Sequence, residues 1–371
     1  MEFQITKEEL LKPLQQVIGV VDRKQLQPVL SFVLITVSDN ELIISTTDLD
    51  IQLCAKNTIT PQNNVGEFLL PAKKLLDICK LLPDDSVIKI LVNNENNKTT
   101  LIANKSRFTL STLDPKSFPL KQEKFADHSI SIPKDKLKNL LASTAFAIAQ
   151  QDVRHYLLGM LWEVAGSEFK VVATDGHRLA MGGMDVSEGK ENGNKKIVVP
   201  RKSILELTRL LETADSDVFV NFSDKSAQIS TDSFIFTTKL LEVQFPDYRR
   251  VFPNSEDSFI VEIDREEFRQ VLNRVAILSN EKQRAVRLCF SENQLVIAAN
   301  NPEQEQAEEL LEILYNNLPL EICFNIGYLL DVVNKITTDR FKMQLKQANT
   351  PVLITPDNLE NTSYIIMPMS L

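Results

Sequence analysis

The stretch TKEELLKPLQQVIGVV (residues 6–21) decides the fold, because two later stretches repeat its pattern: PKDKLKNLLASTAFAIA (residues 133–149) and DREEFRQVLNRVAIL (residues 264–278). In each stretch, apolar residues recur three or four positions apart, as they do on one face of an α-helix. The anchoring residues Leu10, Leu137 and Phe268 are separated by 127 and 131 residues. This spacing predicts three copies of one structural unit.

A second helical pattern recurs in the same order: PAKKLLDICKLL (residues 71–82), PRKSILELTRLL (residues 200–211) and NIGYLLDVVNKI (residues 325–336). Pro71 and Pro200 suit the opening turn of a helix, where the missing N–H costs nothing. Runs at strand spacing, such as residues 41–45, 170–173 and 294–298, lie between the helices. The pattern predicts an α+β fold of three repeated domains, each with two helices on one side of an antiparallel sheet. We expect domains at residues 1–126, 127–252 and 253–371.

The composition excludes several classes of protein. The chain has 371 residues, 43% of them hydrophobic and 25% charged, and its apolar runs are shorter than the roughly 18 residues of a membrane span. Its four cysteines lack a CxxC spacing, which indicates a reducing cytoplasm, with no disulfide frame and no metal site. GxGxxG and GxxxxGK[ST] motifs are missing, so no cofactor is expected. The net charge of −9 argues against a simple nucleic-acid binder.

The stretch VVATDGHRLA (residues 171–180) places an acid, an imidazole and a guanidinium together, as an active site would. It occupies the same place in the repeat as Thr47-Asp48-Leu49 and Asn300-Asn301-Pro302, each at the end of an apolar strand. Thr, Asp and Asn commonly satisfy backbone groups at such turns. The chain has no GxSxG motif, and its histidines lack metal-ligand spacing. We therefore predict no enzyme, no catalytic residue and no metal, although a function built on this turn remains open.

Several motifs, in order along the whole chain, closely resemble the bacterial DNA polymerase III beta subunits, the replicative sliding clamps. They are QQDVRHYLLGMLWE (150–163), VVATDGHRLA (171–180), VVPRKSILEL (198–207), FPDYRRV (245–251), ILSNEKQRAVRL (277–288), NNPEQEQAEE (300–309) and YIIMPMSL (364–371). The resemblance implies three clamp domains that close head-to-tail into a dimeric ring. A ring also explains an acidic protein that works on DNA, because only the lining of the hole needs positive charge.

The resemblance implies a function without chemistry. The ring would encircle duplex DNA without reading its sequence, and would tether the replicative polymerase, the clamp loader and other proteins that carry a clamp-binding motif. An alternative from the repeats alone is a peptide-binding scaffold that does not encircle DNA. By resemblance, the positions that contact DNA are Lys24, Gln151, Tyr156 and Lys202.

The dimer interface implied by the resemblance joins the first and third repeats. The first repeat offers Lys74, Arg107 and Phe108, which would meet Ile277 and Leu278 of the third. The third repeat also carries an acidic run that we expect to be helix-like, with Glu303, Glu305, Glu308 and Glu309. Exposed ion pairs contribute little affinity, so these charges would mainly set the register.

A peptide-binding pocket is implied between the second and third domains. The positions that match it are Leu157, Thr174, Gly176, His177, Arg178, Leu179, Pro246, Arg250, Val251, Asn325, Tyr328, Val352, Ile366, Met367, Pro368 and Met369. Its apolar walls would supply burial, and His177 and Arg178 would be donors on the rim. The sequence departs from the family's usual residues at Gln283, Asn349, Pro351 and Ser370, which affects fine specificity.

Overall fold

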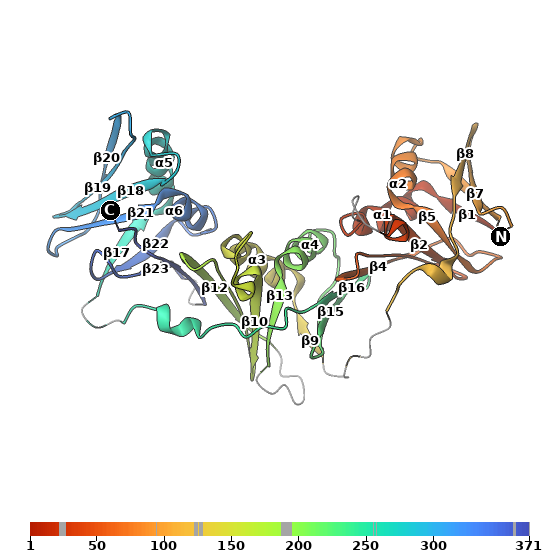
Figure 1. Ribbon diagram of the computed structural model, residues 1–371, viewed down its shortest axis with the longest axis horizontal. Coiled ribbons are helices and arrows are strands. Elements are labelled where there is room, and N and C mark those ends of the chain that lie inside the picture. The colour runs from red at the N-terminus through yellow and green to blue at the C-terminus, as the bar shows by residue number, and fades with distance from the viewer. Residues whose placement is uncertain are drawn as a thin grey trace. The chain divides into compact units, whose positions relative to one another are not determined.

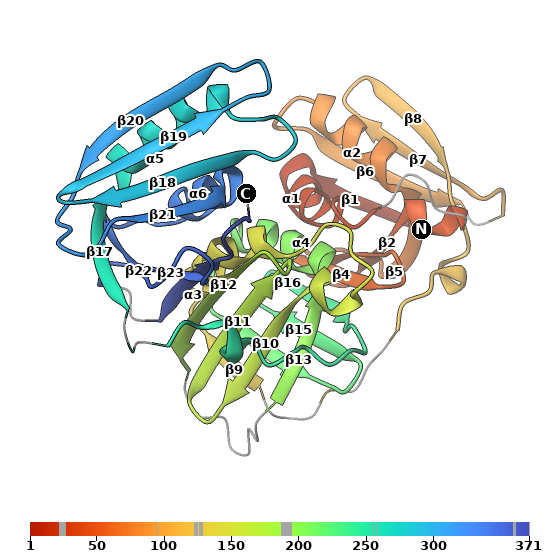
Figure 2. The same cartoon turned by 60° about the vertical axis from the view of Figure 1, so that its left-hand side comes forward.

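The computed structural model describes residues 1–21, 27–93, 95–121, 125, 129–186, 195–254, 256, 258–358 and 361–370. Within them, the three predicted repeats are present, and each contains two successive βαβββ segments (Figures 1 and 2). The prediction of an α+β fold with three two-helix repeats is confirmed.

The elements of the three repeats correspond one to one. The first repeat consists of β1 (Glu2–Thr6), α1 (Lys7–Val17), β2 (Phe32–Val37), β3 (Glu41–Thr47), β4 (Ile51–Thr58), β5 (Gly66–Pro71), α2 (Ala72–Leu81), β6 (Val87–Asn93), β7 (Lys98–Ala103) and β8 (Ser106–Ser111). The second consists of β9 (Ser129–Ile132), α3 (Lys134–Thr144), β10 (Gly159–Ala165), β11 (Glu168–Thr174), β12 (Arg178–Asp185), β13 (Lys195–Pro200), α4 (Arg201–Leu211), β14 (Val218–Phe222), β15 (Ser226–Ser230) and β16 (Phe234–Lys239). The third consists of β17 (Phe259–Asp264), α5 (Arg265–Val275), β18 (Ala285–Ser291), β19 (Gln294–Asn300), β20 (Gln306–Glu312), β21 (Leu320–Asn325), α6 (Ile326–Val333), β22 (Arg340–Leu345), β23 (Val352–Pro356) and β24 (Thr362–Ile366).

Local sequence signals start the helices. Thr6 and Glu9 form a capping box at α1, in which each side chain accepts from the backbone N–H of the other residue. Asp264 caps α5 by accepting from the N–H of Glu267, and Asn325 caps α6. Pro71 is the N-cap of α2 and not part of its first turn.

The chain forms two compact bodies, and the division runs through α3 and α4 of the second repeat. The N-terminal body comprises residues 1–137 and 205–240, and the C-terminal body comprises residues 138–186, 195–204 and 241–370 among the described residues. The N-terminal body contains the eight-stranded sheet β5-β2-β3-β4-β16-β15-β14-β9 and the four-stranded sheet β1-β6-β7-β8. The C-terminal body contains β13-β10-β11-β12-β24-β23-β22-β17 and β20-β19-β18-β21.

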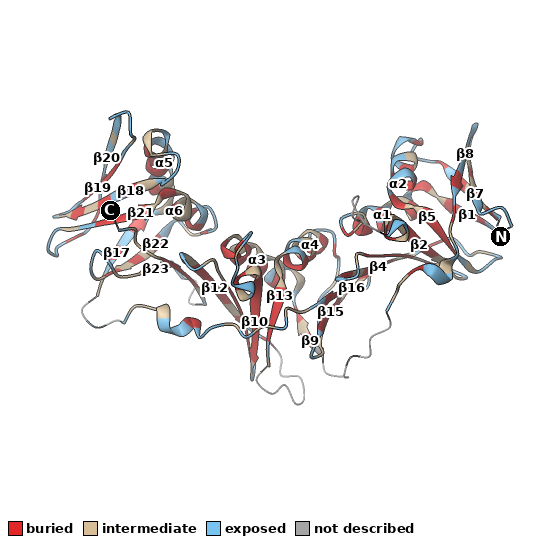
Figure 3. Cartoon of the chain, in the orientation of Figure 1, coloured by how far each residue is buried: buried red, intermediate tan, exposed pale blue. Residues whose placement is uncertain are grey.

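The sheets differ from the expected single sheet in each repeat. Each repeat has two four-stranded half-sheets, and half-sheets of neighbouring repeats join edge to edge through the pairs β4–β16 and β12–β24. Buried residues line the faces where helices and sheets meet (Figure 3). The predicted anchors Leu10, Leu137 and Phe268 are all fully buried.

The acidic run of the third repeat was predicted to be helix-like, and this prediction is wrong. Glu303 and Glu305 lie in a turn, where Asn301 accepts from the N–H of Glu305 and donates to its carboxylate. Glu308 and Glu309 lie in β20, which pairs with β19 along its whole length. Alternate exposure along β20 shows the two-residue period of a strand.

Candidate functional site

The TDGHR segment is a turn between β11 and β12 that its own side chains close. The Thr174 hydroxyl accepts from Gly176 N–H at 3.0 Å and donates to Arg178 C=O at 2.6 Å. The Asp175 carboxylate accepts from the N–H groups of His177 and Arg178. Thr47 and Asp48 make the same set of bonds at the β3–β4 turn. The prediction of a structural turn is confirmed.

Gly176 holds the tightest point of this turn. Its φ is +89°, and a Cβ atom there would lie 2.9 Å from the Arg154 guanidinium. We expect Gly176→Ala to lower the free energy of unfolding by about 1–2 kcal/mol, because left-handed backbone disfavours a side chain. Thermal unfolding measures this loss. Gly166→Ala is the matched control, because Gly166 also has a positive φ, +60°, but a Cβ atom there would have no neighbour within 4 Å. An equal loss of unfolding free energy in both variants would show that the Arg154 guanidinium adds nothing to the cost of the backbone conformation.

Arg178 ties three elements of the C-terminal body together. Its guanidinium donates to Asp175 at 3.1 Å, to the C=O of Phe146 at 2.9 Å, and to Asp331 on α6. It also lies over the rings of Phe146 and Tyr328, at 5.0 and 4.5 Å from their centroids. These three bonds use part of the guanidinium's hydrogen-bonding capacity. Arg178 also lines the cavity beside the turn, so its role as a donor on the rim stays a prediction.

A cavity of about 160 Å³ opens beside the turn. Three segments form it: the β11–β12 turn with the residues before β10, the connection that follows β16, and the end of β24. A hydrogen bond from Met367 N–H to His177 C=O extends the β12–β24 pairing and places Met367 at the cavity. Of the residues predicted for the pocket, the cavity brings together Leu157, Thr174, Gly176, Arg178, Leu179, Pro246, Val251 and Met367.

Other residues that were not predicted for the pocket also line the cavity: Arg154, Phe245, Asp247, Tyr248 and Ile365. Tyr156, which was expected to contact DNA, lines it too. Tyr156 packs edge-on against Phe245, with ring centroids 6.4 Å apart. Phe245 and Tyr248 could have been predicted for the cavity, because both are aromatic and lie within two residues of Pro246 in the FPDYRRV motif. Mostly apolar walls with a few polar groups suit a short peptide with apolar and aromatic side chains.

The other predicted pocket residues do not line this cavity. Val352 and Ile366 are fully buried in the sheet, and Arg250 is exposed and paired with Asp247. His177 is exposed and stacks on Tyr328, with centroids 6.2 Å apart. Asn325 caps α6, and Met369 donates its N–H to Cys323 C=O. Pro368 lies between Met367 and Met369 in the tail.

A charge cluster around the buried Glu163 carboxylate joins the connection (residues 241–252) to β10. The Glu163 carboxylate accepts from the Tyr248 hydroxyl at 2.9 Å and from the Arg249 guanidinium at 3.0 and 3.1 Å, and pairs with Lys196 at 3.0 Å. Burial raises the pKa of Glu163, but the hydrogen bonds from Arg249, Lys196 and Tyr248 outweigh it and hold the pKa below its usual range. The Glu163 carboxylate is therefore ionised at neutral pH. The stability that its ion pairs contribute is lost only as the pH falls through the lowered pKa of Glu163.

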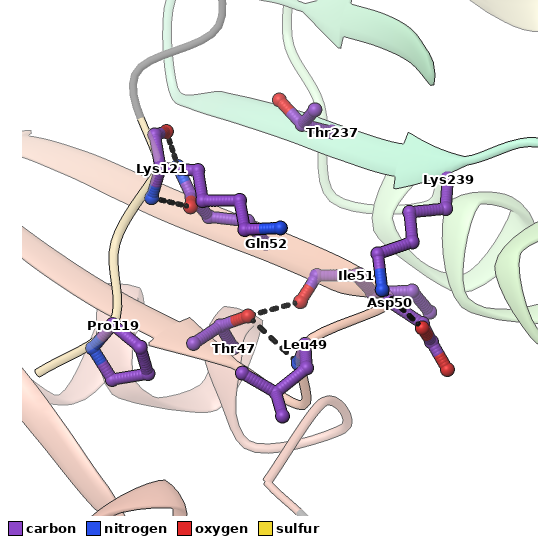
Figure 4. Close-up of a pocket in the computed structure, with 9 residues that line it drawn as sticks. All are labelled: Thr47, Leu49, Asp50, Ile51, Gln52, Pro119, Lys121, Thr237 and Lys239. Carbon is purple, nitrogen blue, oxygen red and sulfur yellow. Dashed lines mark hydrogen bonds and ion pairs between the residues drawn. The ribbon is translucent and has the colours of Figure 1, made fainter. Parts of the chain in front are cut away.

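The N-terminal body contains a smaller cavity at the equivalent place, of about 30 Å³, beside the β3–β4 turn (Figure 4). Gln52 and Thr237 pair there where Leu179 and Ile365 pair in the C-terminal body, and Lys239 replaces Met367. Gln52 exchanges two hydrogen bonds with the backbone of Lys121, and Lys239 pairs with Asp50 at 2.9 Å. These polar contacts leave room for little more than water.

Apart from Tyr156, the described residues expected at DNA and at a dimer interface do not line this cavity. Gln151 is exposed ahead of β10, Lys202 is exposed on α4, and Lys24 lies outside the described residues. Lys74 is exposed on α2, and Arg107 and Phe108 lie on β8. Ile277 is 78% exposed and precedes the half-buried Leu278. Glu309 pairs with Arg274 of its own chain.

Three family models match the chain in sequence order. The N-terminal, central and C-terminal domains of the DNA polymerase III beta subunit match residues 1–122, 131–247 and 249–370. The beta sliding clamp of Pseudomonas aeruginosa is 45% identical over 371 residues, and that of Escherichia coli K12 is 40% identical, each covering 100% of both chains. A crystal structure of the Pseudomonas aeruginosa DNA polymerase III subunit beta bound to griselimycin has a TM-score of 0.95 at 45% identity, over 100% of both chains.

Proposed function

We propose, because this chain belongs to the DNA polymerase III beta subunit family, that the cavity beside the TDGHR turn is where its partner proteins insert a short peptide motif. The chain itself is a DNA sliding clamp, a non-catalytic protein that tethers a replicative polymerase to DNA for processive synthesis. The observation that carries the site is the convergence of a turn, a connection and the chain's last strand on one apolar cavity.

The peptide site is tested by binding a fluorescent peptide that carries the clamp-binding motif of a polymerase C-terminus. We expect Met367→Ala to weaken binding about tenfold, because it removes apolar area from the cavity wall. Leu81→Ala on α2 is the control; Leu81 is 87% exposed in the N-terminal body, and its loss should leave the affinity unchanged. Unchanged affinity of the Met367 variant would remove this assignment of the pocket.

The dimer forms head-to-tail in this family, and the free sheet edges support the residues proposed for it. Half-sheets already join at β4–β16 and β12–β24, whereas the two four-stranded sheets end at β1 and β8 and at β20 and β21 within the described residues. Unpaired edges readily accept another strand. We propose that β8 of one protomer meets β20 of its partner, with Lys74, Arg107 and Phe108 facing Ile277, Leu278, Glu303, Glu305, Glu308 and Glu309.

The remaining assignments follow from the same membership. We propose domains 1–126, 127–252 and 253–371; the first boundary falls outside the described residues, and the second follows the turn Tyr248–Val251. Lys24, Gln151, Tyr156 and Lys202 are proposed to contact DNA, and Tyr156 also lines the peptide cavity.

Cytoplasmic localisation is proposed from the four unpaired cysteines. Within the described residues, no helix is long and apolar enough to cross a membrane. A scaffold without DNA encirclement is not favoured.

A further inference from the structure

The connection between β16 and β17 supplies one whole wall of the peptide cavity, yet it belongs to no sheet. Phe245, Pro246, Asp247, Tyr248 and Val251 line the cavity from this connection. Within the described residues, only its first part pairs with a strand, through Leu241 N–H to Val198 C=O at 2.9 Å. The position of this wall therefore depends on side-chain contacts.

Phe245, Val251 and Phe252 pack against the apolar cluster that contains Tyr248, and the polar contacts of Tyr248 and Arg249 converge on the Glu163 carboxylate. Glu163 lies on β10 and is 5% exposed. It receives three hydrogen bonds from two adjacent residues of the connection, Tyr248 and Arg249. Arg249 also stacks over the Tyr248 ring, 4.8 Å from its centroid. Charge-assisted bonds are stronger than neutral ones, so these three fix both where the Tyr248 ring lies and how the connection is oriented.

We propose that Glu163 is a positioning residue of the peptide site, holding the wall formed by residues 245–251 in its binding conformation without touching the peptide. Tyr248 transmits the effect, because it packs below the cavity against Leu161, Leu179 and Ile365. When residues 245–251 are already ordered, peptide binding does not have to include the entropic cost of ordering them. Loss of the anchor therefore weakens the peptide's affinity while the sheet beneath keeps its packing. This inference rests on the proposed peptide site.

The test measures dissociation constants for the fluorescent polymerase peptide with the full-length chain. We expect Glu163→Gln, which keeps the shape and removes the charge, to raise the dissociation constant about tenfold. Lys196→Ala is the matched control: Lys196 pairs with the same carboxylate at 3.0 Å, but from β13 and not from the connection. It should change affinity less than about twofold, because it leaves the bonds from Tyr248 and Arg249 to Glu163 in place. Tyr248→Phe removes only one hydroxyl and serves as a second, milder variant.

Two further measurements separate positioning from general stability. Adding Arg249→Ala to Glu163→Gln should weaken binding no further than either change alone, because both act through one contact. Hydrogen exchange should accelerate at the amides of Arg250 and Phe252, which donate to Asp247 and Arg249 C=O, and stay unchanged in β10 and β11. Wild-type affinity in Glu163→Gln and Tyr248→Phe, or an equal loss in Lys196→Ala, overturns the proposal. If the wild type itself does not bind the peptide, the proposed site fails instead.

Discussion

We expect a dimer of this chain, once loaded by a clamp loader, to remain on circular duplex DNA during gel filtration and to leave when one cut makes the DNA linear. A closed ring is held by topology, whereas its contacts with phosphates are few, sequence-independent and weakened by salt. A net charge of −9 cannot retain the protein by attraction over its whole surface. The measurement is the fraction of labelled protein that elutes with the DNA.

The control for this experiment is the same circle treated with inactivated restriction enzyme, which should retain the protein. Raising the salt from about 0.1 to about 1 M shortens the screening length from about 10 to 3 Å, so retention on the circle that survives high salt is topological. Equal retention on circular and linear DNA would contradict encirclement and would favour a scaffold that binds the surface of DNA.

Arg178→Ala should cause the largest loss of stability among single changes near the cavity. It removes three hydrogen bonds and two aromatic contacts from a side chain that is 11% exposed, and leaves the Asp175 carboxylate without its ion pair. We expect the free energy of unfolding to fall by about 2–4 kcal/mol. Thermal unfolding measures it, together with peptide affinity, which should fall because Arg178 lines the cavity.

Two variants make this prediction specific. Arg250→Ala removes the same chemical group from a side chain that is 84% exposed, so it should change stability by less than about 0.5 kcal/mol. Arg178→Lys keeps the charge, but an ammonium cannot reproduce the forked contacts of a guanidinium, so it should recover only part of the loss. Equal stability of the two alanine variants would show that Arg178 does not tie the elements together.

Much of the site could be read from the sequence because its turn is local. The Thr174 and Asp175 side chains bond backbone groups of the next four residues, so the turn has the same form as at Thr47 and Asp48. The pocket was predicted through family resemblance, and about half of its proposed residues line the cavity. Of those that do not, Val352 and Ile366 are buried in the sheet, whereas His177 and Arg250 are exposed.

The sequence by itself determined the three repeats, their six helices and the buried anchors Leu10, Leu137 and Phe268, because helical periodicity and capping act within a few residues. Only the tertiary structure decided that half-sheets of neighbouring repeats join through β4–β16 and β12–β24, that Glu308 and Glu309 lie in a strand, and that Glu163 holds Tyr248, 85 residues away. These outcomes depend on which distant segment covers each strand edge and each buried charge. Patterns within a few residues cannot predict these contacts, because the partners lie far apart in the sequence.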